Sequence, residues 1–169
     1  MSRKIALALV LVLGAAIQAA AQPTVFVVRH AERADDGGGN LMMASDPELS
    51  KAGQARAESL ASMLRSAGVT TIVATPYKRT QQTAAPLATA LGIEITTVGP
   101  RETADVPDLV RASKGNVLIV GHSNTVPQIL KALGVAEEVT LGDADYDNLF
   151  IVTPGSPPGL VRLHFRGGD

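Results

Sequence analysis

The chain contains no cysteine, and this absence excludes several kinds of protein. Without a thiol there can be no disulfide scaffold, no thiolate metal site and no cysteine nucleophile. Tryptophan is also absent, and three phenylalanines and two tyrosines are the only aromatic residues. Stacking platforms for nucleic-acid bases or sugars are therefore scarce. The core of the folded protein must be mainly aliphatic.

An excess of charge of one sign is lacking as well. The 15 lysines and arginines nearly balance the 16 aspartates and glutamates, which leaves a net charge of -1. No block of basic residues occurs anywhere in the chain. A protein that binds nucleic acid or an anionic membrane as its main partner normally carries such a basic surface. We therefore predict neither kind of partner.

One long hydrophobic run is present, and it lies at the amino-terminal end. Residues 1–4 are positively charged, residues 5–17 are apolar, and small residues precede Gln22. This order is typical of a secretory signal peptide. A membrane anchor is the alternative, but the apolar run would cover only about two-thirds of a ~30 Å hydrocarbon core. We predict a signal peptide over residues 1–21 and a single domain over residues 22–169, exported to the periplasm or the medium without a stable membrane anchor.

Short runs of apolar and β-branched residues recur along the rest of the chain. They occupy residues 24–28, 69–74, 93–98, 117–120 and 149–153. Continuous rather than alternating apolar runs indicate strands that are buried on both faces, as in a parallel sheet. A last run, residues 160–165, follows a turn rich in proline and glycine. It predicts an edge strand that is antiparallel to its neighbour.

Apolar residues at helical spacing lie between these strands. The stripes cover residues 53–64, 84–91 and 126–133. Ser50 is placed to cap the first helix and Gly68 to stop it. Pro86 predicts a kink or a restart in the second, whereas Pro127 falls in the first turn of the third, where proline is tolerated. Strands that alternate with helices predict an α/β fold: a three-layer sandwich with a mostly parallel central sheet and helices on both faces.

Charged side chains follow three of the predicted strands. Arg29 and His30 follow the first strand, Arg79 the second and His122 the fourth. Because the carboxyl ends of parallel strands meet at one edge of a sheet, we expect these four side chains to converge. Two guanidinium groups and one imidazole can surround a tetrahedral dianion while a second, neutral imidazole attacks phosphorus. This set predicts a site that binds and transfers phosphoryl groups.

A metal site is the competing interpretation of the two histidines. However, no aspartate or glutamate stands at a ligand spacing from both of them, and the two arginines would repel a cation. A purely structural role is the other alternative for each histidine alone. The coincidence of four such groups at one sheet edge favours the phosphoryl site.

Four segments of the chain match, in order, the motif set of a known family. They are Val-Val-Arg-His-Ala-Glu at residues 27–32, Leu-Ser with the following Gly, Gln and Ala at 49–57, Thr-Pro with Arg-Thr, Gln, Thr and Ala at 75–84, and Val-Gly-His-Ser at 120–123. This set resembles the histidine phosphatase superfamily, also called phosphoglycerate mutase-like. The resemblance spans residues 24–165, and the combination is far more specific than any one segment.

The resemblance implies a phosphomonoester hydrolase that needs neither a metal nor another cofactor. It implies that His30 is the nucleophile and becomes a phosphohistidine. Arg29, Arg79 and His122 would form the phosphate pocket, and Ser123 would add a further contact.

The family usually supplies a carboxylic acid that protonates the leaving group. Glu102 follows the third strand and is the first candidate, while Asp105 and Asp147 are lesser candidates. Thr80 and Asn124 could contact the phosphate, or they could cap the helices at whose starts they lie.

The predicted substrate is a small phosphorylated molecule or a phosphoprotein. Mutases of this family carry extra segments that cover the cleft, and this chain has almost no length to spare for them, which favours hydrolysis. A phosphoglycerate mutase-type phosphotransferase and a catalytically weak phosphoryl-binding module remain as alternatives. An interaction protein that uses the glycine loop at residues 37–39 is a third.

Overall fold

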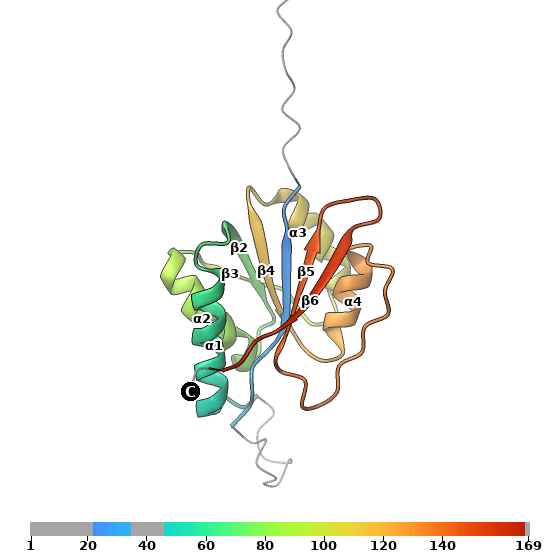
Figure 1. Cartoon of the computed structure of the whole chain (residues 1–169). Coiled ribbons are helices and arrows are strands. Elements are labelled where there is room, and N and C mark those ends of the chain that lie inside the picture. The colour runs from blue at the N-terminus through green and yellow to red at the C-terminus, as the bar shows by residue number, and fades with distance from the viewer. Residues whose placement is uncertain (1–21, 35–45, 168–169) are drawn as a thin grey trace, which may run out of the picture.

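The computed structural model describes residues 22–34 and 46–167, and Figure 1 shows the whole chain. The predicted signal peptide and the glycine loop at residues 37–39 lie outside the described residues. In chain order the elements are β1 (Val25–Arg29), α1 (Lys51–Leu64), β2 (Val69–Ala74), α2 (Lys78–Leu91), β3 (Ile95–Thr97), the short 3₁₀ helix η1 (Thr103–Asp105), α3 (Val106–Ala112), β4 (Asn116–Gly121), α4 (Thr125–Ala132), β5 (Asn148–Thr153) and β6 (Gly159–His164).

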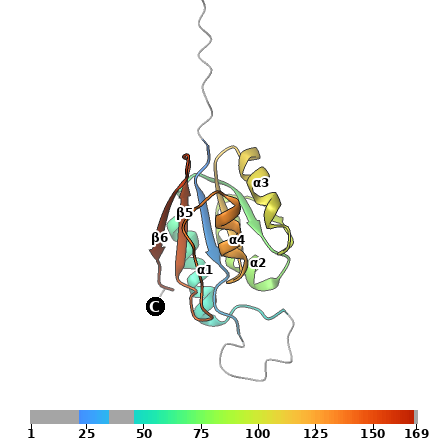
Figure 2. The ribbon, with the colours of Figure 1, turned by 90° about the vertical axis from the view of Figure 1, so that its right-hand side faces the viewer.

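The strands form one six-stranded sheet in the order β3-β2-β4-β1-β5-β6. The first four strands in this order are parallel to one another, whereas β5 is antiparallel to β1 and β6 is antiparallel to β5. Helices α1 and α2 cover one face of the sheet, and α3 and α4 cover the other (Figures 1 and 2). The three-layer α/β fold and the antiparallel edge strand are therefore confirmed.

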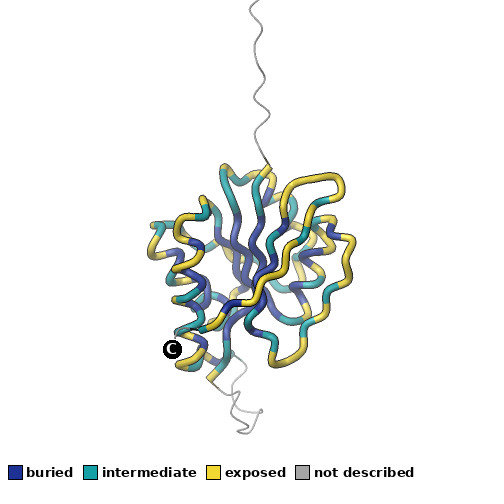
Figure 3. The backbone as a smooth tube through the Cα atoms, viewed as in Figure 1, coloured by how far each residue is buried: buried dark blue, intermediate teal, exposed yellow. Residues whose placement is uncertain are grey.

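An aliphatic core lies on each face of the sheet. Leu60 of α1 and Leu87 of α2 pack with Leu118 on one face, and Val126 of α4 packs with Ile119 on the other. Burying one such side chain stabilises the fold by about 1.5–3 kcal/mol. Figure 3 shows the central strands as the most deeply buried part of the molecule. This burial explains why their sequences are continuous apolar runs.

Helix α1 begins as predicted. The Ser50 side chain accepts a hydrogen bond from the backbone N–H of Gly53 at 3.1 Å, which satisfies one of the free donors of the first turn. The helix ends at Leu64, earlier than predicted. Gly68, with φ of 66°, lies in the turn that follows and leads into β2.

Helix α2 continues through Pro86 in one piece, so the predicted restart is wrong. Proline removes the bond to the carbonyl of Gln82, but both residues line a surface groove where water can replace that bond. Helix α3 was not predicted at all. Its signals are the proline at position 107, which is tolerated in a first turn, and the buried pair Val106 and Val110.

Gly53 allows α1 to lie directly against the loop that follows β1. A Cβ atom at this position would be 2.2 Å from the carbonyl oxygen of Glu32, so the backbone would have to shift. We expect Gly53→Ala to lower the free energy of unfolding by about 1–3 kcal/mol, measured by denaturant titration. Lys51→Ala, at an exposed position of the same helix, should change it by less than about 0.5 kcal/mol. Equal stabilities for Gly53→Ala and the parent protein would contradict this account.

Candidate active site

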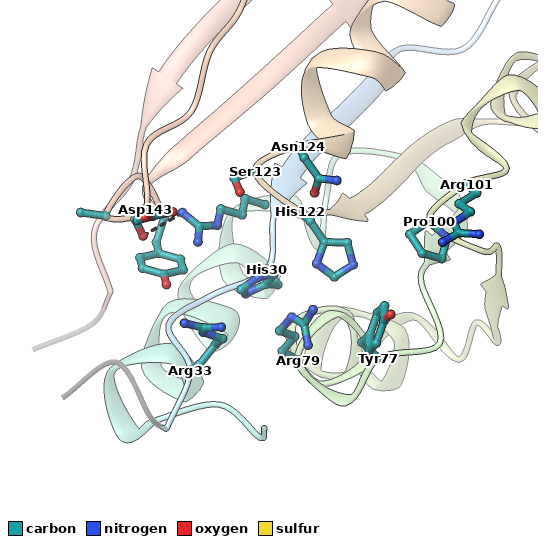
Figure 4. A pocket seen from close by; sticks show the side chains of 13 residues that line it. His30, Arg33, Tyr77, Arg79, Pro100, Arg101, His122, Ser123, Asn124 and Asp143 are labelled. Carbon is teal, nitrogen blue, oxygen red and sulfur yellow. Dashed lines mark hydrogen bonds between the residues drawn. The ribbon is translucent and has the colours of Figure 1, made fainter. Parts of the chain in front are cut away.

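A cavity of about 690 Å³ opens where β1, β2 and β4 end (Figure 4). All four predicted core members of the site, and Ser123, line it: Arg29, His30, Arg79, His122 and Ser123. Six further lining residues bear on the chemistry: Arg33, Tyr77, Arg101, Asn124, Asp143 and Tyr146. The structure thus brings together the side chains that the sequence places after three parallel strands.

His30 is held in the form that a nucleophile needs. Its Nδ1 lies 2.8 Å from the carbonyl oxygen of Ala31, and a carbonyl can only accept, so Nδ1 carries the ring proton. The lone pair is therefore on Nε2. Burial is the main cause that lowers the pKa of His30 to about 3, and the positive charge of Arg29 lowers it further, although the bond to Ala31 opposes the shift. The ring stays neutral at ordinary pH.

Arg29 connects the end of β1 to the loop that precedes β5. Its Nη1 donates to the carbonyl oxygens of Gly142 at 2.8 Å and Asp143 at 2.9 Å, and its guanidinium carbon lies 4.0 Å from the centre of the Tyr146 ring. Both Nη1 hydrogens are used in this way. Nε is buried and has no hydrogen-bond partner among the described residues. The edge formed by Nε and Nη2 is therefore the one that suits two oxygens of a phosphate, and an unmet buried donor costs about 1–3 kcal/mol.

Arg79 has a similar setting on the other side of the cavity. Its guanidinium carbon lies 4.4 Å from the centre of the Tyr77 ring, and its Nη1 lies 3.6 Å from a carboxylate oxygen of Asp46. Asp46 also accepts the backbone N–H of Lys78 at 2.9 Å, at the start of α2. Arg29 and Arg79 thus each lie over a tyrosine ring, and this cation–π contact helps to hold the guanidinium group in place.

His122 lies close to the nucleophile, with the two ring centres 5.3 Å apart. Its Nε2 is 2.9 Å from the hydroxyl oxygen of Thr75. Burial, followed by the charges of Arg79 and Arg29, lowers the pKa of His122 to about 4, against a smaller opposing effect of Asp46. His122 is therefore neutral while the cavity holds no anion.

The residues that follow His122 also face the cavity. Ser123 and Asn124 line it, and Asn124 makes no side-chain cap bond to α4. Thr125 instead accepts the backbone N–H of His122 at 2.8 Å. Thr80 was predicted as a possible phosphate contact, but it is wholly buried and does not line the cavity. Its hydroxyl is bonded to backbone carbonyls of the same turn.

Glu102, the first candidate for the acid, does not line the cavity. It is exposed, and its carboxylate accepts the backbone N–H of Gly99 at 2.9 Å while its own N–H donates to the Gly99 carbonyl at 2.9 Å. These two bonds close a turn that carries Arg101 to the cavity and direct the carboxylate back onto the turn. The lesser candidates lie elsewhere too: Asp105 is exposed at the end of η1, and Asp147 is bonded to a surface histidine.

The loop before β5 contributes Asp143 and Tyr146 to the cavity, and neither residue was predicted from the sequence. Among the residues that the structure describes, Asp143 is the only carboxyl residue in the lining. Strand β5 is antiparallel to β1, so the loop before it, rather than the one after it, reaches this edge of the sheet. The predicted hairpin fixed only the direction of β6 relative to β5, so no signal in the sequence located these two residues.

Within residues 22–34 and 46–167, no group of three histidine, aspartate or glutamate side chains is placed to hold a metal ion. No helix in the same part of the chain is both long and apolar enough to cross a bilayer.

The fold is shared with solved structures of phosphatases. The protein histidine phosphatase SixA, complexed with tungstate, superposes with a TM-score of 0.61 and 16% identity, over 83% of this chain and 96% of that one. A mycobacterial glucosyl-3-phosphoglycerate phosphatase in complex with VO3 has a TM-score of 0.62 and 13% identity, over 86% of this chain and 100% of that one. At such identities the similarity concerns the fold alone.

A sequence model of the histidine phosphatase superfamily (branch 1) matches residues 25–100, the segment that holds Arg29, His30 and Arg79. This segment makes up 76 of the 169 residues, and over it the chain is similar to the superfamily. A relative named probable phosphoglycerate mutase GpmB, from Yersinia enterocolitica, is 37% identical over 73 residues, which are 43% of this chain and 34% of that protein. The match thus spans about a third of the relative's length. These similarities support a phosphatase or mutase activity.

Proposed function

We propose that this protein is a member of the superfamily and a phosphomonoester hydrolase that acts through a phosphohistidine on His30. The observation that carries the proposal is the neutral His30 ring, with its Nε2 lone pair free, in a cavity lined by Arg29, Arg79 and His122. A nucleophile in such a site is ready to attack, and the cationic groups match the charge of a phosphoryl group.

In the proposed reaction, Nε2 of His30 attacks phosphorus and the bond to the leaving oxygen breaks. The free edge of Arg29, together with Arg79 and His122, binds the three remaining phosphoryl oxygens. The departing oxygen takes a proton from Asp143, the carboxyl residue of the cavity lining. Asp143 then accepts a proton from water, and the resulting hydroxide attacks the phosphohistidine. Inorganic phosphate leaves, and His30 is neutral again.

The comparisons support this proposal at the level of the family. Two structural relatives are phosphatases, one solved with tungstate and one with VO3, both oxyanions that stand in for phosphate. The proposed substrate is a small phosphorylated molecule or a phosphoprotein in an exported compartment. The compartment rests on the sequence of residues 1–21 alone.

Metal removal and an oxyanion inhibitor test where the charge stabilisation comes from. In the proposal it comes from Arg29, Arg79 and His122, so exhaustive chelation should leave hydrolysis of p-nitrophenyl phosphate unchanged. Vanadate mimics five-coordinate phosphorus and should bind at least about 10²-fold more tightly than the substrate. Activity that returns only after a divalent metal is added would contradict the proposal.

The similarity to a phosphoglycerate mutase makes phosphoryl transfer the second candidate. A mutase returns the phosphoryl group to a phosphoglycerate, so 3-phosphoglycerate primed with 2,3-bisphosphoglycerate should isomerise faster than phosphate is released. The hydrolase should release phosphate from both compounds without isomerisation. A phosphoryl-binding module would show saturable phosphate binding and no product from any ester.

A further inference from the structure

A chain of two hydroxyl groups lies behind His122. Nε2 of His122 is 2.9 Å from the Thr75 hydroxyl oxygen, which is 2.8 Å from the Thr80 hydroxyl oxygen. The Thr80 hydroxyl is in turn 2.9 Å from the carbonyl oxygen of Thr75 and 2.8 Å from that of Tyr77. Both threonines are buried, and neither lines the cavity.

The backbone carbonyls at the end of this chain of hydrogen bonds determine which atom is the donor in each of its bonds. A carbonyl can only accept, so the single hydrogen of the Thr80 hydroxyl is directed to the backbone. The hydrogen between the two hydroxyls must then come from Thr75. That leaves Thr75 without a hydrogen for His122, so the contact at Nε2 uses a hydrogen of the imidazole. The neutral ring of His122 is therefore protonated on Nε2.

The other ring nitrogen of His122 is the one left for a ligand. The ring lines the cavity between His30 and Tyr77, whereas the Thr75 partner of Nε2 lies outside the lining (Figure 4). A neutral ring of this tautomer presents the unprotonated Nδ1 as an acceptor, which does not suit a phosphate oxygen. A ring that gains a proton on Nδ1 becomes a cationic donor.

We infer that Thr75 and Thr80 are positioning residues that keep one proton of His122 on Nε2, so that Nδ1 is the nitrogen protonated when a phosphate dianion binds. The proton comes from solvent, and it leaves again with the product phosphate. The tautomer in the free protein follows from the hydroxyl chain alone. The uptake of a proton on binding also rests on the proposed function.

The charges around His122 agree with a ring that is neutral in the free site and cationic in the occupied one. Arg79 on α2, Arg29 on β1 and the neutral His30 ring face it, and the phenol ring of Tyr77 lies against it. The carboxylate of Asp46 is the nearby opposing charge, and it is engaged by Arg79. A phosphate dianion would reverse the sign of the local field, since it lies among these cations and next to the imidazole.

Nitrogen NMR of the protein labelled in its histidines tests the tautomer directly. In the free protein at neutral pH, we expect His122 to show a protonated Nε2 and an unprotonated Nδ1. Thr80→Val removes the acceptor of the Thr75 hydrogen, which is then free to be donated to Nε2, so the population should shift to the Nδ1-protonated tautomer. Thr75→Val should give a mixture, and Thr75→Ser should restore the parent spectrum.

Calorimetry with inorganic phosphate tests the uptake of the proton. Above the second pKa of phosphate, binding to the parent protein should take up about one proton per site, measured in two buffers of different ionisation enthalpy. Thr75→Val should bind phosphate about tenfold more weakly. Thr71→Val is the matched control, because Thr71 lies on β2, the strand that Thr75 follows, and its hydroxyl is bonded to Ser113 outside the cavity.

Three outcomes would overturn the inference. They are a free His122 protonated on Nδ1, a tautomer that is the same in Thr80→Val and Thr75→Val as in the parent, and phosphate binding without proton uptake. The first two concern the protein without ligand. They therefore decide the role of the threonines even if no ester is hydrolysed. Failure of the inference about the tautomer can thus be distinguished from failure of the proposed function.

Discussion

The His30→Ala variant is expected to lose turnover by about 10⁴-fold or more and to take up no phosphoryl group. The reason is that Nε2 of His30 forms the new bond to phosphorus, and water positioned in the same cavity is a far weaker nucleophile. Rapid quenching with substrate labelled in its phosphoryl group should trap label on His30 of the parent protein. The adduct should be labile in acid and stable in alkali, as a phosphoramidate is.

Two controls separate loss of the nucleophile from loss of the fold. His164→Ala should retain turnover and label, because His164 is exposed on β6 and is bonded to Asp147 at the surface. His30→Ala should still bind vanadate or phosphate, because Arg29 and Arg79 remain. Label recovered on a serine, or full label in His30→Ala, would refute the phosphohistidine mechanism.

The Asp143→Asn variant is expected to lose activity in proportion to how much the leaving group needs a proton. An alkyl phosphate would expel a costly alkoxide, so its rate should fall by roughly 10²- to 10⁴-fold. A nitrophenyl phosphate expels an already stable phenolate, so its rate should fall much less. The two esters should be compared at the phosphorylation step, measured by single-turnover kinetics, because hydrolysis of the phosphohistidine is common to both.

Glu102→Gln is the matched control for this experiment. Its carboxylate fastens the turn that carries Arg101, so any loss should be small and equal for both esters. A selective loss on the alkyl ester with Glu102→Gln, and none with Asp143→Asn, would reverse the assignment of the acid. Equal losses on both esters with Asp143→Asn would leave it a structural role in the loop that Arg29 holds.

Several features of the protein were already determined by local sequence. The apolar runs predicted all six strands within two residues of their observed ends. The signal is strongest for β1 and β4, which are buried on both faces and therefore carry almost no polar side chains. The cap at Ser50 was predictable because a cap bond joins residues only three positions apart. Arg29, His30, Arg79 and His122 could be assigned to one site because each follows a strand, and parallel strands end at the same edge.

The tertiary structure alone decided the rest, because it depends on contacts between distant segments. The reversed direction of β5 brings Asp143 and Tyr146 to the cavity, and no local pattern marks them. Arg29 is 113 residues from Gly142, so its role in holding that loop becomes visible only when the sheet is assembled. Glu102 was misassigned for the same reason. Its position after a strand suggested an active-site acid, but in the folded chain its carboxylate accepts the backbone N–H of Gly99 in its own turn.

The same division between local sequence and tertiary contacts applies to the protonation of His122. A histidine after a strand can be recognised in the sequence, but the nitrogen that carries its proton is set by Thr75, 47 residues away, and by the Thr80 hydroxyl behind it. Residue type and strand order therefore determined which side chains meet at this edge. Packing between segments determined which of their atoms face a phosphate, because hydrogen bonds are short and directional and are completed only in the folded chain.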